Sequence, residues 1–290
     1  MDLFFQTLVN GLLVGGIYIA VAAGFTLCFG VLHVIDFAVG EWVMLGAFAV
    51  FWLNFFTGVD PLIFLPLIMV LFMVVGYYFQ PLLQRVITNQ QSNALLMALA
   101  FTFGMSILFR GSALTLFGFN QRSLTTFLSG KNFEILGISI PALRFGATVF
   151  AVLVTLLFMF LLYKTKLGLA VRAAAERQDV AGLMGIDSSN IARIVYAIYL
   201  GLTAMSGTFL GSIFSVHPDM GLRYTLFAFF VVVAGGLGSI QGAILAGIML
   251  GLINSFVAVY VGGQYIFLIL FTVLYLILLV APKGILGKGW

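Results

Sequence analysis

The sequence predicts an all-α polytopic membrane protein with about eight transmembrane segments, some of them broken. Of its 290 residues, 63% are hydrophobic and 8% are charged, whereas a soluble domain carries about a quarter charged residues. The apolar residues form runs about 20 residues long, enough to cross a hydrocarbon core of about 30 Å. Polar residues gather in short stretches between these runs. We therefore expect one transmembrane domain over residues 1–290.

Eight apolar segments follow one another along the chain. The first begins beside Asp2 and has no basic stretch before it, so we expect a membrane helix rather than a cleaved signal. The predicted segments lie near residues 6–30, 38–57, 61–80, 93–115, 142–163, 191–213, 225–259 and 264–281.

The seventh segment is too long for one helix and contains a glycine-rich stretch at 234–242, which predicts a helix, a break and a second helix. A similar interruption at 34–41 precedes the second segment. Broken helices survive in membranes only where protein or a water-filled cavity satisfies the freed backbone groups. The stretches 36–49 and 238–251 share this pattern and favour a transport route built on an internal repeat. Coincidence in a chain with 33 glycines is the alternative.

Loop cations predict the orientation in the membrane. Placing residues 164–190 in the cytoplasm puts eight of the 13 Lys and Arg residues inside and leaves five outside. The N-terminus is then outside and the C-terminus inside. A polar outer loop covers about residues 115–141, and its portion 132–140 is expected to form a small hairpin.

The segment 164–190 is the most polar stretch of the chain, and its helix-forming residues predict a helix over 169–184. Gly185 supplies a left-handed stop, and Asp187 or Ser188 is placed to cap the next membrane helix. We expect this exposed helix to bind a soluble partner. The alternative is a helix lying in the lipid headgroup layer, although its acidic residues dilute the basic face that anionic lipid prefers.

Asp36 and Glu41 are two acids beside Gly40 in an otherwise apolar region. A charge at the middle of a bilayer costs roughly 2.5–3.5 kcal/mol, so we do not expect either to face lipid. Asp36 is placed to accept backbone N–H bonds at the start of the second helix. Contact with a transported substrate is a second interpretation, and the two are compatible.

The glycine-rich stretch contains Gly235, Gly236, Gly238, Ser239 and Gln241, which allow close approach of backbones. No Lys-Ser or Lys-Thr pair follows, so it is not a phosphate-binding loop. Close helix packing through small residues is the alternative to a role in transport.

Several function classes are disfavoured by what the sequence lacks. Its one cysteine, Cys28, and its two well-separated histidines, His33 and His217, form no metal-ligand cluster. We find no nucleophile–base–acid set, and no basic run with interleaved aromatics that would indicate nucleic-acid binding. We expect neither enzymatic activity nor a cofactor bound by this chain.

Four blocks of the sequence, in order along nearly the whole chain, carry a family resemblance. Together they are similar to the permease subunits of the branched-chain amino-acid ABC importers. The blocks are GLLVGGIYIAVAAGFTLCFGVLHVIDFAVGEWVMLGAF (11–48), AAAERQDVAGLMGID (173–187), VVVAGGLGSIQGAILAGIMLGLINS (231–255) and APKGILG (281–287).

The resemblance implies an importer permease in a bacterial inner membrane. Its partners would be a homologous permease, two cytoplasmic ATPase subunits that hold ATP and Mg²⁺, and a periplasmic substrate-binding protein. The coupling segment that docks into the ATPase would include Arg172, Ala174, Glu176, Asp179, Leu183 and Gly185. The translocation route would be flanked by Asp36, Phe37, Gly40, Glu41, Gly235, Gly236, Gly238, Ser239 and Gln241.

One departure bears on the substrate. The family commonly has Asn-Phe-Ala-His-Gly-Glu where this chain has Asp36 and Val39 in the first and fourth positions. A permease for urea or short amides is therefore an alternative assignment. A stand-alone transporter driven by an ion gradient, with Asp36 and Glu41 as proton or sodium sites, is a further alternative.

Overall fold

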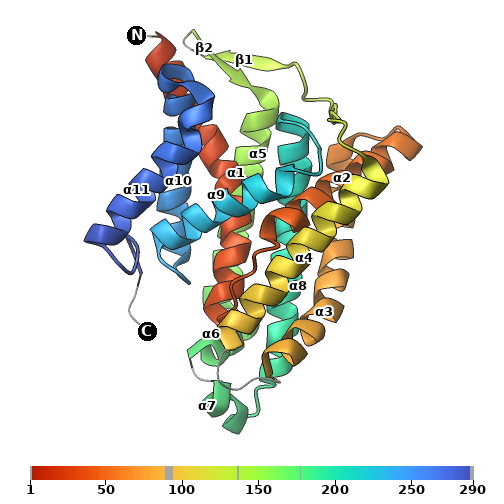
Figure 1. Ribbon diagram of the computed structural model, residues 1–290, viewed down its shortest axis with the longest axis vertical. Helices are drawn as coiled ribbons and strands as arrows, with labels where there is room; N and C mark the ends of the chain where they lie inside the picture. Colours follow the sequence, from red (N-terminus) through yellow and green to blue (C-terminus); the bar gives the residue numbers. More distant parts are fainter. Residues whose placement is uncertain (1, 89–93, 136, 177, 288–290) are drawn as a thin grey trace.

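The computed structural model describes residues 2–88, 94–135, 137–176 and 178–287 as a helical protein with one small hairpin (Figure 1). The hairpin consists of β1 (Asn132–Ile135) and β2 (Ile138–Pro141). The α-helices are α1 (Asp2–Leu32), α2 (Val39–Thr57), α3 (Leu65–Thr88), α4 (Ala94–Phe117), α5 (Ala142–Lys164), α6 (Lys166–Glu176), α7 (Gln178–Leu183), α8 (Ser188–Ile213), α9 (Met220–Gly235), α10 (Ile240–Val257) and α11 (Ile266–Val280).

The helices agree with the predicted segments. In the described part of the chain, seven helical stretches are long and apolar enough to cross a membrane, and α9 is a shorter apolar helix. The predicted break in the seventh segment is confirmed, because α9 ends at Gly235 and α10 begins at Ile240. The all-α membrane fold is therefore the one that the sequence predicts.

The core is built around α1 and α8, in whose most apolar 18-residue windows 89% of the residues are buried, whereas the share is 17–22% in α3, α4 and α5. Small residues let the helices approach closely. A Cβ at Gly15 would lie 2.9 Å from the carbonyl oxygen of Gly247 on α10, and Gly251 packs directly against Gly15. These glycines allow α1 and α10 to pack backbone against backbone.

The two ends of the molecule differ (Figure 1). The N-terminus and the hairpin lie at one end, and α6 and α7 at the opposite end. The predicted hairpin forms with Phe133 opposite Ile140. The Gln6 side chain fastens it to α1, since its amide donates to the Ser139 carbonyl at 2.6 Å and accepts from the Ser139 N–H at 3.0 Å.

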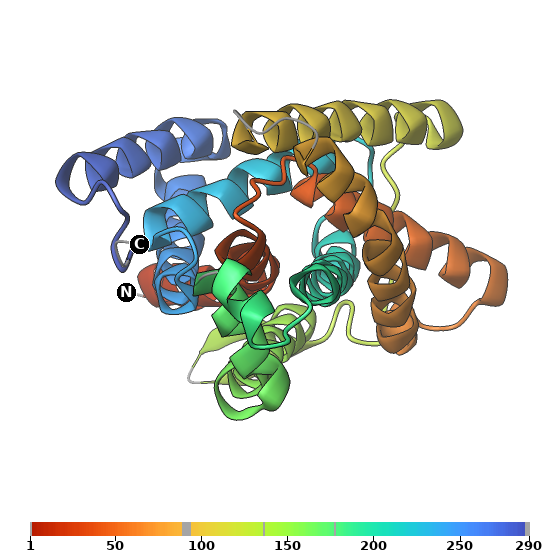
Figure 2. The same ribbon diagram turned by 90° about the horizontal axis from the view of Figure 1, so that it is seen from below.

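Seen from the α6–α7 end, α4 and α11 lie along one side of the molecule and α5 and α6 on the opposite side (Figure 2). The prediction of a helix over 169–184 agrees with the described residues, which are helical over 166–176 in α6 and over 178–183 in α7. Residue 177, between them, lies outside the described residues. The predicted stop is confirmed, with Gly185 at φ 81°. Asp187 caps α8 by accepting from the N–H groups of Ser189 and Asn190.

Candidate translocation route and coupling surface

Asp36 is fully buried in the break between α1 and α2. Its Oδ1 accepts the Ala38 N–H at 2.8 Å. Its Oδ2 accepts the hydroxyls of Tyr196 and Tyr199 on α8, each at 3.0 Å. The expected hydrogen bond from the start of the second helix is confirmed. The two tyrosine hydroxyls donate to the other carboxyl oxygen, so both oxygens of this buried group have partners, as burial of a polar group requires.

Two threonines bind further backbone groups of this break. Thr102 on α4 accepts the Phe37 N–H at 3.1 Å and donates to the Ile35 carbonyl at 3.2 Å. Thr225 on α9 accepts the Gly40 N–H at 3.0 Å. Protein side chains thus replace water around the broken helix, as the membrane interior demands.

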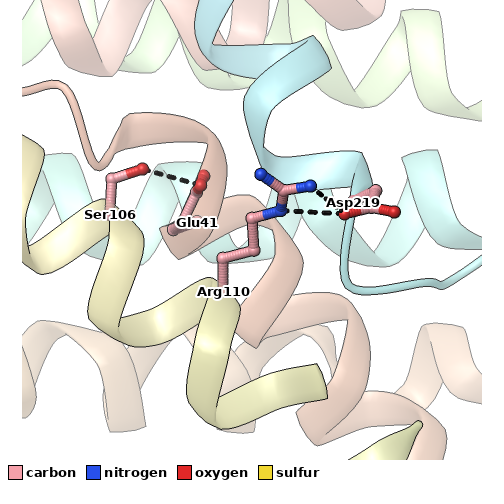
Figure 3. A network of polar contacts seen from close by, with 4 residues as sticks. All are labelled: Glu41, Ser106, Arg110 and Asp219. Atoms are coloured by element: carbon pink, nitrogen blue, oxygen red, sulfur yellow. Dashed lines mark hydrogen bonds and ion pairs between the residues drawn. The ribbon is translucent and has the colours of Figure 1, made fainter. Parts of the chain in front are cut away.

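Glu41 lies in the first turn of α2 and is one of a group of four polar residues (Figure 3). It is fully buried, and its Oε1 accepts the Ser106 hydroxyl of α4 at 2.8 Å. Its Oε2 has no hydrogen-bond partner among the described residues. Beside it, Arg110 of α4 donates through Nε to Asp219 at 2.8 Å and forms an ion pair with it at 2.6 Å.

The Arg110–Asp219 pair is half-exposed, with 44% and 47% of the two side chains accessible. Charged groups within membrane segments almost always face a protein interior or a water-filled cavity. The face formed by α4 and the start of α9 is therefore unsuited to contact with lipid tails.

The glycine-rich break between α9 and α10 is surrounded by backbone, unlike the break between α1 and α2, whose partners are side chains. Gly235 and Gly242 pack backbone against backbone. The chain after α11 folds back onto this point, where Ile285 and Leu286 donate N–H bonds to the carbonyls of Ala234 and Gly235 at 2.8 and 3.1 Å. Gly236 adopts φ 103°, which favours glycine.

The second half of this break is more open. Gly238 also has a positive φ, of 80°. Ser239 caps α10 by accepting the Gly242 N–H at 3.1 Å, and Gln241 is exposed. With Gly238, these two residues line a cavity beside α6.

The structure does not bring the two predicted route segments together. Gly40 contacts Gly221 and Thr225 near the start of α9, whereas Gly235 ends that helix. Helical rise separates Gly221 from Gly235 by about 20 Å. The two groups therefore lie at two depths along α9.

Some of the predicted coupling residues are exposed and one is buried. Arg172, Glu176, Leu183 and Gly185 are exposed, and Leu183 and Met184 form an apolar tip with 88% and 80% of their surfaces accessible. Ala174 is buried against the membrane helices and so anchors α6. Asp179 belongs to α7, and its side chain lies outside the described residues.

Several residues that complete the site were missed by sequence reasoning. Tyr196, Tyr199, Thr102, Ser106 and Thr225 each bind the break or Glu41 through a hydroxyl. A hydroxyl on an apolar helix is common and usually bonds within its own helix, so no sequence signal singles these residues out.

Comparison with known proteins identifies the chain. The family model described as the permease component of the branched-chain amino acid transport system matches residues 7–281. The chain belongs to this family. It is therefore a permease component of an ATP-binding-cassette transporter, as its sequence motifs predicted, and transport rather than catalysis is its role.

Its relatives match over nearly their full length. The permease protein BraD of Pseudomonas aeruginosa, from a high-affinity branched-chain amino acid transport system, is 32% identical over 98% of this chain and 96% of its own. LivH of Escherichia coli K12, from a system of the same description, is 29% identical with the same coverage. A solved structure, PsaBC from Streptococcus pneumoniae in complex with Fab, aligns with 98% of this chain and 93% of its own, at 15% identity and a TM-score of 0.48.

Proposed function

We propose that this permease imports branched-chain amino acids across a bacterial inner membrane as part of an ATP-driven complex. The observation that carries the proposal is the family match, which extends from α1 to the end of α11. The complex would contain a second, homologous permease, two cytoplasmic ATPase subunits that bind ATP and Mg²⁺, and a periplasmic binding protein that delivers the amino acid.

The exposed tip of α7 is a candidate binding surface for the ATPase. Leu183 and Met184 are large apolar side chains at the end of the molecule farthest from the hairpin. Exposed apolar groups of this kind are typical of a protein-binding surface. We assign this tip and α6 to coupling.

The translocation route is proposed to pass along the α2, α4 and α9 face on which Glu41, Arg110 and Asp219 lie. This face holds charged groups within membrane helices, which are costly in lipid. Asp36 helps to hold the broken helix in place beside the route through its three hydrogen bonds. The glycine-rich break would form the inner boundary.

Uptake by the reconstituted complex tests the proposal. Proteoliposomes with the binding protein outside and ATP inside should accumulate labelled leucine, and unlabelled isoleucine and valine should compete. Competition by urea instead of these amino acids would assign the chain to the urea and short-amide permeases.

The ion-coupled alternative is tested in the same vesicles. This chain alone, with a proton or sodium gradient and no ATPase, should give no accumulation. Uptake under those conditions would contradict the proposal and direct attention to Glu41, whose Oε2 has no hydrogen-bond partner in the described structure.

A further inference from the structure

A cavity of about 420 Å³ lies between α1, α5, α6 and the start of α10. Its volume falls within the range of about 300–1,000 Å³ that is typical of small-molecule sites. One part of the lining is aliphatic and consists of Leu27, Val31, Leu162 and Val171. The cavity is at the α6 side of the molecule, away from the Arg110–Asp219 pair.

Thr26 on α1 also lines this cavity and is fully buried. Its hydroxyl has no hydrogen-bond partner among the described residues. Thr7 and Thr203 bond the carbonyl one turn back, to Leu3 and Tyr199, each at 2.7 Å. The buried hydroxyls of Thr155 and Thr208 also have no partner among the described residues, but these threonines do not line the cavity. A buried hydroxyl without a partner costs free energy, so a ligand that hydrogen-bonds it is favoured.

A second polar feature of the lining attracts anions. The first N–H groups of a helix have no intrahelical partner, and Ser239 takes only that of Gly242. The N–H groups of Ile240 and Gln241 remain at the positive end of the 18-residue helix α10. Arg172 also lines the cavity, with its guanidinium carbon 5.4 Å from the centre of the Tyr163 ring.

We propose that this cavity is a second binding site for the transported amino acid, reached from the inner side of the membrane. The inference rests on the proposed function for the identity of its ligand. The α-carboxylate binds Arg172 and the start of α10, the α-ammonium donates to the Thr26 hydroxyl, and the branched side chain packs on Leu27 and Val31. Because α6 supplies Val171, Arg172 and Ala175 to the lining, an occupied cavity joins the coupling segment to α1 and α10.

Equilibrium binding of labelled leucine tests this site. The purified complex is placed in phosphatidylcholine nanodiscs without the binding protein and without ATP, so that neither delivery nor turnover contributes. Wild type should bind leucine. Thr26→Val, which removes only the hydroxyl, should weaken binding several-fold, and Arg172→Gln about tenfold or more. Lys166→Gln, which removes an exposed cation of α6 outside the cavity, should bind as wild type does.

Analogues that lack one charged group define the ligand. Leucinamide lacks the carboxylate and 4-methylpentanoate lacks the ammonium, so both should bind less tightly than leucine. Equal binding of 4-methylpentanoate, together with no effect of Thr26→Val, would overturn the assignment of the ammonium and with it the proposal. Ala175→Phe fills the cavity, and leucine affinity equal to wild type in a variant with unchanged melting temperature would also overturn it.

A lipid headgroup is the competing source of an anion. Leucine should bind equally well in phosphatidylcholine and phosphatidylglycerol discs, and loss of binding in the latter would assign the cavity to lipid and refute the proposal. Failure of this inference differs from failure of the proposed function. Wild-type complex that imports leucine but binds none in the discs overturns only the inner site, whereas complex that imports no branched-chain amino acid overturns the function.

Discussion

At the level of single residues, Asp36 holds the broken entry to α2 against α8. Replacing it with alanine leaves the Tyr196 and Tyr199 hydroxyls and the Ala38 N–H without their partner. Each unsatisfied buried donor costs about 1–3 kcal/mol. We expect Asp36→Ala to lower the melting temperature of the purified protein strongly. Asp36→Asn should cost less, since its amide both accepts and donates and the tyrosine oxygens also accept. Equal melting of Asp36→Ala and wild type would contradict this role.

The Arg110–Asp219 pair permits a test that separates structure from transport. If the pair only joins α4 to α9, replacing both charges by apolar groups should be tolerated, because a half-exposed ion pair contributes only about 0–1 kcal/mol to stability. If the pair lines the route, uptake stays impaired when stability returns. We expect Arg110→Met to lose stability, and the double variant Arg110→Met, Asp219→Leu to recover its melting temperature but not ATP-dependent leucine uptake. Arg223→Gln, on the same helix α9, serves as the control.

At the level of elements, α2 and α9 pack closely at two glycines, Gly40 and Gly221, which have no side chains to separate the helices. Gly40 lies directly against the Gly221 carbonyl, and a Cβ on Gly221 would meet the Glu41 carboxyl group. Overpacking of this kind costs typically 1–3 kcal/mol, and backbone contacts leave little room to adjust. Gly40→Ala should therefore lower both the yield of folded protein and its melting temperature. Gly104→Ala on α4 has no described atom within 4 Å of the new Cβ and should behave as wild type.

We expect the tip of α7 to bind the ATPase without contributing to the stability of the fold. Leu183 and Met184 are exposed, so Leu183→Asp with Met184→Asp should leave the melting temperature unchanged. The charges would be buried and unpaired in a contact with the ATPase, which is costly. We expect loss of ATPase co-purification and at least a tenfold drop in uptake. Phe133→Asp on the hairpin, 52% exposed at the opposite end, is the matched control. Normal coupling in the α7 variant would move the ATPase contact elsewhere.

The helices and their breaks could be predicted from sequence because they follow from local chemistry. Apolar runs give the membrane helices, and Gly185 and Asp187 give the end of one helix and the start of the next. Good helix formers likewise gave the helical residues of α6 and α7 on both sides of residue 177. The partners of Asp36 and Glu41 come from residues far along the chain, and pairing between distant helices leaves no periodic signal.

At the level of the whole molecule, the two ends carry different elements, and the buried helices α1 and α8 run between them. One end carries the hairpin clamped by Gln6, and the other carries α6 and α7 (Figure 1). The Glu41 network and the inner cavity lie on different helices and at different depths. An alternating-access cycle opens the route to one side of the membrane at a time. The separation of the Glu41 region from the inner cavity gives the chain one polar region toward each of its two ends.

The orientation of these ends can be measured directly because the only cysteine, Cys28, is fully buried. A single exposed cysteine added to the chain should therefore be the one reactive thiol. The predominance of cations in the α6–α7 half predicts that this end lies in the cytoplasm. In right-side-out vesicles, Phe133→Cys should react with a membrane-impermeant maleimide, and Leu183→Cys should react only after the vesicles are permeabilised. Wild type provides the background, and labelling of Leu183→Cys in sealed vesicles would reverse the topology and exclude α7 as the ATPase contact.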